Sequence, residues 1–145
     1  MVALVLDASV ALAFLLPGEK GYQLAREIIA SMRGSDGVVP GLWVTEVAKG
    51  LLIAERKGRI SSEDADRLLL TATGLLDRSL TVATVHRHLF YNVHHIGRMS
   101  GLTAYGAAYL ELAVQHSLPL ATFDTALRRA ARDPVHDIRV LPESV

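Results

Sequence analysis

The sequence of 145 residues contains no cysteine. This absence excludes disulfide bridges and thiolate zinc sites, and it suits a protein of the reducing cytoplasm. Positive charge is not in excess either, because 15 Lys and Arg balance 15 Asp and Glu. Global charge therefore gives no sign of nucleic-acid binding, although a local basic patch stays open. No apolar run reaches the roughly 18 residues that span a bilayer, so we expect no membrane association.

The first twenty residues are apolar but lack the features of a signal peptide. They have no basic leader, and Asp7 interrupts them. Half of all residues are hydrophobic, which is enough for a sizeable core at this length. The chain also has no repeat, low-complexity segment or long linker, so we predict a single domain over residues 1–145.

Short apolar runs alternate with helical patterns along the chain. Strands are predicted at residues 2–6, 37–40, 80–85, 118–123 and 138–142. Helices are predicted at residues 8–16, 22–32, 42–57, 64–76, 85–96, 104–116 and 125–132. This alternation predicts a three-layer α/β/α sandwich around a central, mainly parallel twisted sheet. Ligands of such folds bind beyond the carboxyl ends of the strands.

Two acids stand at predicted strand ends. Asp7 follows the first strand and Asp124 follows the fourth. Each could simply cap the helix that comes after it, as Asp does well. In a parallel sheet, however, both would emerge at the same edge, where neighbouring carboxylates repel each other unless a cation lies between them. The pair therefore favours a cation site.

Further polar residues accompany this pair. Glu46 lies beside the apolar stripe of its helix, where burial is costly unless the acid is paired, reaches water at the rim or lies near a metal. Ser9 lies two residues after Asp7, and Thr122 lies two before Asp124. Both hydroxyls could orient carboxylates or metal-bound water, or be ordinary turn and strand residues. Oxygen ligands favour Mg²⁺ or Mn²⁺, a chemistry suited to phosphodiester hydrolysis.

Four segments resemble the signature segments of the PIN-domain family. They are "VLDASVALAFLLPGE", "PGLWVTEVAKGLLIAERKGRIS", "LTAYGAAYLELA" and "LPLATFDTALRRAA". Within that family they are most similar to the VapC toxins of toxin–antitoxin pairs. The resemblance implies a metal-dependent endoribonuclease that acts on transfer or ribosomal RNA, forms homodimers and is held inactive by a small VapB antitoxin. It implies that Asp7 and Asp124 hold metal, while Glu46 holds a metal through water or positions the attacking water.

One position departs from the family pattern. The fourth acid, normally the Asp of "L-T-x-Y-D-A-A-Y", falls on Gly106. An acid in the first turn of a helix is favoured by the macrodipole, whereas glycine costs up to about 1 kcal/mol relative to alanine. Glu111 lies about 140° round the same helix and should not substitute without rearrangement. Water could complete the metal shell, but the metal affinity should fall.

Basic residues near these motifs give a second set of candidates. Lys49, Arg128 and Arg132 could bind RNA phosphates or an acidic antitoxin tail, or could form a solvated helix face. The histidines are weaker candidates. His88 and His95 are two helical turns apart, so one ion could not bridge them on a straight helix, and we interpret the group as surface or partly buried residues.

Gly106 leaves three hypotheses open. The protein could be an active or weakened ribonuclease that uses Asp7, Glu46 and Asp124. It could instead be a PIN-fold protein that has lost catalysis and binds RNA or an antitoxin. Thirdly, the glycine could be an engineered or selected change that permits expression of a toxic protein, although alanine or asparagine is the more usual choice.

Overall fold

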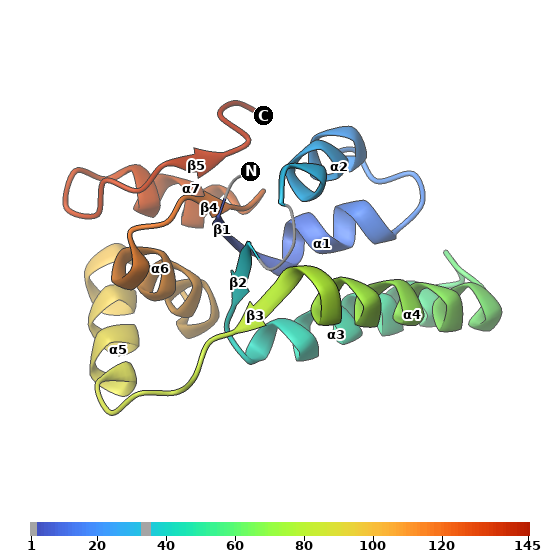
Figure 1. The fold of residues 1–145 in the computed structure, drawn as a ribbon, viewed down its shortest axis with the longest axis horizontal. Coiled ribbons are helices and arrows are strands. Elements are labelled where there is room, and N and C mark those ends of the chain that lie inside the picture. The colour runs from blue at the N-terminus through green and yellow to red at the C-terminus, as the bar shows by residue number, and fades with distance from the viewer. Residues whose placement is uncertain (1–2, 33–35) are drawn as a thin grey trace.

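The computed structural model describes residues 3–32 and 36–145 (Figure 1). Within them one sheet has the strand order β3-β2-β1-β4-β5, and every neighbouring pair is parallel. The strands are β1 (Leu4–Leu6), β2 (Gly37–Val39), β3 (Leu80–Val82), β4 (Leu120–Ala121) and β5 (Val140–Leu141). The predicted parallel α/β fold is confirmed.

Helices cover both faces of this sheet. They are α1 (Ala8–Leu15), α2 (Tyr22–Ser31), α3 (Leu42–Arg56), α4 (Ser62–Ser79), α5 (Leu89–Ser100), α6 (Ala104–His116) and α7 (Thr125–Arg132). Figure 1 shows α1 to α4 on one side of the strands and α5 to α7 on the other. The first three strands follow one another in one direction across the sheet, whereas β4 and β5 are added on the other side of β1. As a result, β1 and β4 lie side by side although they are far apart in sequence.

The core explains why the apolar runs form these elements. Every residue of β1 is buried, as expected for a strand covered on both faces. On α3 the apolar residues at helical spacing, Trp43, Val47, Leu51 and Ala54, are buried as well. In the described ranges, no helix is both long and apolar enough to cross a membrane.

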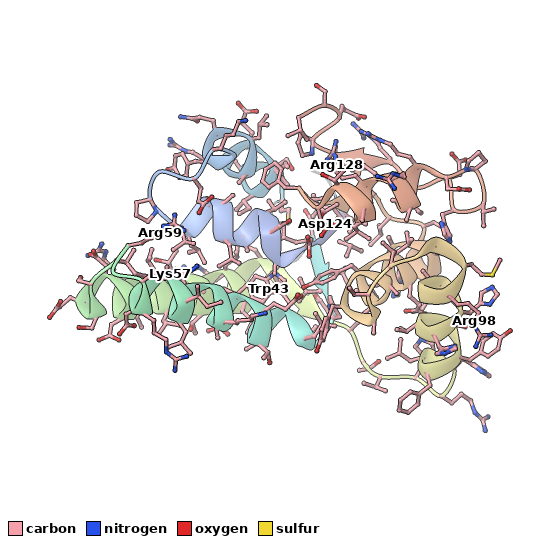
Figure 2. All side chains as sticks on the ribbon, turned by 180° about the vertical axis from the view of Figure 1, so that it is seen from behind. Trp43, Lys57, Arg59, Arg98, Asp124 and Arg128 are labelled. Atoms are coloured by element: carbon pink, nitrogen blue, oxygen red, sulfur yellow. The ribbon has the colours of Figure 1, made fainter. Side chains whose placement is uncertain are left out.

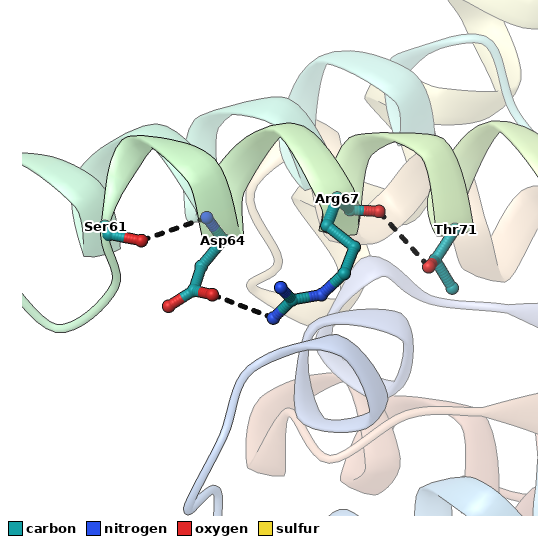
Figure 3. Close-up of polar contacts among 4 residues, drawn as sticks. All are labelled: Ser61, Asp64, Arg67 and Thr71. Carbon is teal, nitrogen blue, oxygen red and sulfur yellow. Dashed lines mark hydrogen bonds and ion pairs between the residues drawn. The ribbon is translucent and has the colours of Figure 1, made fainter.

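Side-chain caps mark the starts of α4 and α6. Ser61 Oγ accepts a hydrogen bond from the Asp64 amide at 3.0 Å, so α4 begins at Ser62, two residues before the predicted start (Figure 3). Arg67 then binds Asp64 at 2.8 Å and is the main cause that holds the pKa of this carboxyl below its usual range. Thr103 caps α6 in the same way, because its Oγ1 accepts from the Gly106 amide at 3.2 Å.

The region after β3 differs from the sequence prediction. The strand predicted over residues 80–85 ends at Val82, and the helix predicted from Val85 begins only at Leu89. The register of β3 with β2 ends at Val82 and Val39, and the Ala83 amide still donates to the Val39 carbonyl at 2.9 Å. Val85 is exposed and therefore does not extend the apolar stripe of α5.

Candidate active site

A cavity of about 440 Å³ opens at the carboxyl ends of β1 and β4. Three acids from separate parts of the chain line it, namely Asp7 before α1, Glu46 on α3 and Asp124 before α7. Figure 2 shows Asp124 near the middle of the molecule, at the start of α7. The parallel sheet thus brings together the three acids that the sequence singles out.

Asp7 is held by two hydroxyl groups. The Ser9 and Thr122 hydroxyls both donate to its Oδ2 at 2.7 Å. Each hydroxyl also accepts a backbone amide at 3.0 Å, from Phe123 and Asp124 respectively. Because an amide occupies a lone pair of each hydroxyl, the hydroxyl proton is directed at Asp7. Asp7 Oδ1 takes no side-chain hydrogen bond from residues 3–32 or 36–145.

The electrostatic surroundings of Asp7 oppose its charge. The side chain is only 7% exposed, and this burial raises the pKa of its carboxyl. The charge of Asp124 raises the pKa further, whereas the hydrogen bonds from Ser9 and Thr122 lower it. A cation in the cavity would remove both the desolvation penalty and the repulsion between the two carboxylates. These surroundings oppose an isolated charge on Asp7 and would favour a charge that has a cation beside it.

Asp124 has two roles open to it. Its Oδ1 accepts the Leu127 amide at 2.9 Å and so caps α7, as the simpler interpretation of this residue predicts. Asp7, by contrast, is the N-cap residue of α1 but makes no side-chain cap bond. One carboxylate oxygen of Asp124 serves the helix, which leaves its second oxygen for a ligand in the cavity.

Glu46 is fixed by a residue that the sequence did not single out as part of the site. Tyr109 of α6 is 1% exposed, and its hydroxyl donates to Glu46 Oε1 at 2.7 Å. Partial burial raises the pKa of Glu46, as does the charge of Asp7, whereas the Tyr109 bond and Lys49 lower it. Tyr109 lies three residues after Gly106, on the same helix face. That spacing is the signal by which it could have been found.

Gly106 lines the same cavity without supplying a ligand. A Cβ atom placed there would meet Thr103 Oγ1 at 3.7 Å and Leu102 at 3.9 Å, which are ordinary contacts. The site therefore has room for a side chain at residue 106. Glu111 does not fill this role, because its carboxylate binds His86 at 3.2 Å and Asn92 at 3.1 Å and lines other cavities.

The donor set fits magnesium only in part. Among the described residues, no group of three or more His, Cys, Asp or Glu side chains could hold a metal ion. Magnesium is nevertheless often held by one or two carboxylates together with water and substrate phosphates. Asp7 and Asp124 offer oxygen donors of this kind, whereas Gly106 brings no side-chain donor to the cavity. The residues present fit a site of one or two carboxylates that water must complete.

The basic candidates separate in the structure. Lys49 is exposed and lines the cavity with the acids. Arg128 is only 7% exposed, and its guanidinium donates to the carbonyls of Thr122 at 2.8 Å and Pro142 at 2.7 Å. The expectation of a surface contact for Arg128 is therefore corrected, because its charge braces the end of β4 against the C-terminal segment. Arg132 binds the Glu143 carbonyl at 2.6 Å at a second cavity.

The histidines do not form a metal centre within residues 3–32 and 36–145. His86 binds the buried Glu111, and the ring of His95 stacks on Tyr91 with centroids 5.7 Å apart. These contacts agree with the interpretation of the histidines as surface or partly buried residues.

Comparison with known proteins assigns the fold. The family model described as PIN domain matches residues 4–133. The chain belongs to the PIN-domain family. Comparison with curated proteins finds no significant match.

Solved structures show the same PIN fold. The crystal structure of PAE2754 from Pyrobaculum aerophilum is 22% identical with a TM-score of 0.70, and the match covers 96% of this chain and 90% of that one. A toxin–antitoxin complex from Klebsiella pneumoniae is 11% identical with a TM-score of 0.64 and 97% of both chains covered. FitAcB from Neisseria gonorrhoeae is 21% identical with a TM-score of 0.64, covering 94% of this chain and 95% of that one.

Proposed function

We propose that this PIN-domain protein is a magnesium- or manganese-dependent endoribonuclease, the toxin of a type II toxin–antitoxin pair. The observation that carries the proposal is the cavity in which Asp7, Glu46 and Asp124 meet at the carboxyl edge of the sheet. The substrate class is structured RNA, either transfer or ribosomal. We propose that residues 1–145 form one domain that works in the cytoplasm.

Each residue of the cavity has a role in this chemistry. Asp7 and Asp124 would hold the ion, while Ser9 and Thr122 fix the orientation of the Asp7 carboxylate. A bound divalent ion would supply a water of lowered pKa and offset negative charge on the phosphate. Glu46 would orient the attacking water or accept its proton.

Lys49 lies beside these acids, where its ammonium would bind a phosphate of the RNA backbone. Arg132 reaches the surface at the second cavity and would contact the RNA or an acidic segment of the antitoxin. Arg128 is left out of this surface because its guanidinium is buried.

The proposed partner is a VapB-like antitoxin, with a second copy of the chain in a homodimer. Support comes from the fold, which is shared with a toxin–antitoxin complex from Klebsiella pneumoniae. Coexpression with the product of the adjacent reading frame tests whether the antitoxin binds. Size-exclusion chromatography with light scattering then gives the number of copies of the chain in the complex. A complex containing two copies of the chain is the expected result.

RNA cleavage in the presence and absence of Mg²⁺ tests the function. Asp124→Asn should lower the rate at least about 100-fold, because it removes a carboxylate charge from the metal site. Asparagine still caps α7, so the fold should be kept. Asp66→Asn, at an exposed residue of α4, is the control and should cleave like the unchanged protein. Cleavage that survives chelation, or equal rates in both variants, would contradict the proposal.

A second candidate function is a catalytically impaired PIN protein that binds RNA or an antitoxin. The observation that favours it is Gly106, which leaves the cavity without the acid of the family pattern. Gly106→Asp separates the two candidates. If the unchanged protein is inactive and the variant cleaves, the active enzyme is excluded for this sequence, whereas the family chemistry stands. If neither cleaves but an antitoxin binds tightly, the binding function is favoured.

A further inference from the structure

We propose that Tyr109 is a positioning residue that fixes the Glu46 carboxylate in the cavity, so that the reactive geometry of Glu46 is set from α6. For its role in the reaction, this inference rests on the proposed function. The juxtaposition that carries it is the hydrogen bond between the Tyr109 hydroxyl and Glu46 Oε1, at 2.7 Å.

Tyr109 is suited to this task because its own position is fixed. The side chain is 1% exposed and is among the largest fully buried side chains of the core. A ring packed in this way has little freedom to rotate, so the place of its hydroxyl is set by the core. The hydrogen bond joins α6 to α3 across 63 residues of sequence. Tyr109 therefore presents a rigid donor at the wall of the cavity.

Glu46 needs such a donor. Its side chain is half-buried, rich in rotamers and repelled by the nearby charge of Asp7. Lys49 attracts the carboxylate, but its own side chain is exposed and long. Without the tyrosine hydroxyl, rotamers that turn the carboxylate out to water are favoured, because there the charge is solvated and lies farther from Asp7.

The position of the bond also leaves Glu46 able to act. Tyr109 occupies Oε1, and Oε2 is left for a water molecule in the cavity. Gly106, one turn before Tyr109 on the cavity face of α6, adds no carboxylate that could share this work. Tyr109 is therefore a group through which α6 orders the Glu46 carboxylate.

A measurement on the metal-free protein without RNA tests the positioning directly. Three-bond couplings from NMR report whether Glu46 populates one χ1 rotamer or averages over several. We expect one rotamer in the unchanged protein and averaging in Tyr109→Phe, which keeps the ring and loses only the hydroxyl. Tyr91→Phe makes the same change at an exposed tyrosine of α5 and should leave Glu46 ordered. A single Glu46 rotamer in Tyr109→Phe would overturn the proposal.

RNA cleavage kinetics then test the role in the reaction. Tyr109→Phe should lower kcat roughly 10- to 100-fold, as misplacement of a reacting group does, and change KM less than about twofold. In a Glu46→Ala background the same substitution should change kcat by less than about twofold, because the group that it positions is gone. A general effect on folding would instead persist in that background and would overturn the role.

The two sets of measurements separate the inference from the proposed function. If Glu46 loses its fixed rotamer in Tyr109→Phe but the protein cleaves no RNA under any condition, the positioning stands and the ribonuclease function fails. If RNA is cleaved and kcat is unchanged in Tyr109→Phe, the function stands and the positioning role is overturned.

Discussion

Asp7 and Glu111 are both buried carboxylates, exposed by only 7% and 4%, but their surroundings differ. Glu111 is satisfied within the protein, since a histidine ring nitrogen and the Asn92 amide both contact its Oε2. Asp7 Oδ2 accepts from the Ser9 and Thr122 hydroxyls, and two further acids line its cavity. Burial alone therefore does not mark a functional carboxylate. The neighbouring carboxylates of Asp124 and Glu46 in the same cavity are what distinguish Asp7.

Helix α6 separates these two environments. Gly106 and Tyr109 face the acidic cavity, whereas Glu111 faces His86 and Asn92 at other cavities. One helix thus carries both Gly106, which lines the acidic cavity, and a carboxylate that contributes to packing. The predictions below use this difference, beginning with the largest expected effect.

The strongest contrast is in RNA cleavage. Asp7→Asn should lower Mg²⁺-dependent cleavage at least about 100-fold, because it removes a carboxylate charge from the proposed metal site. Glu111→Gln should leave cleavage within about threefold, since its side chain lies outside the cavity. Initial rates on one structured RNA under identical Mg²⁺ concentrations measure both. Equal losses in the two variants would remove the distinction between the carboxylates.

The next effect is a gain at the vacant position. Gly106→Asp should tighten Mg²⁺ binding about tenfold or more, because even an outer-shell metal contact is worth roughly 10–100-fold in affinity. The added Cβ fits without displacing its neighbours. Calorimetric titration with Mg²⁺ gives the affinity, and Gly106→Ala is the control for the change in helix propensity. Equal affinities of the Asp and Ala variants would show that residue 106 does not contribute to the metal site.

Removing Glu111 should instead affect stability. Glu111→Ala leaves His86 and Asn92 without their buried partner, which should cost about 1–3 kcal/mol of unfolding free energy. For a chain of this size that is about 2–4 °C in Tm for each kcal/mol. Gln115→Ala, at an exposed residue of the same helix, should have little effect. Urea unfolding with and without Mg²⁺ gives the free energy of unfolding of each variant. A loss of stability in Glu111→Ala that is seen only with Mg²⁺ would be evidence against this packing role.

The smallest effect is a dependence of stability on pH in metal-free buffer. Burial raises the pKa of Asp7 in the folded protein above its ordinary value of 3.8. The folded state then binds more protons than the unfolded state in the interval above 3.8, so stability falls as the pH rises through that interval. Asp7→Asn should lose this fall in stability with rising pH, and saturating Mg²⁺ should offset the fall in the unchanged protein. The measurement is thermal unfolding of the unchanged protein and of Asp7→Asn between pH 3.5 and pH 7, in steps of about half a pH unit. An equal pH dependence of Tm in the two proteins would show that Asp7 is not desolvated.

Local sequence signals predicted the parts of the molecule that depend on neighbouring residues. A wholly apolar run predicts the buried strand β1, and Asp7 marks its end. Ser61 and Thr103 cap helices through bonds to amides three residues ahead, so their roles follow from the sequence nearby. The parallel sheet then determines that Asp7 and Asp124 share one edge, which made the acidic cavity predictable.

Contacts between distant segments could not be predicted in this way. The bond from Tyr109 to Glu46 depends on how α6 packs against α3, and no local pattern gives that packing. Arg128 lies on a basic helix that suggests a solvated face, but its side chain reaches two backbone carbonyls beyond the helix. The alternating pattern of residues 80–85 likewise did not give the end of β3, whose register with β2 stops at Val82 and Val39.

The most direct test of the metal site is a crystal of the unchanged protein soaked in Mn²⁺ and measured for anomalous scattering. We predict a manganese peak in the cavity beside the carboxylates of Asp7 and Asp124, and none beside Glu111. A peak beside Glu111 and His86, or none at saturating Mn²⁺, would contradict the account that Asp7 lies in a cation site and Glu111 does not.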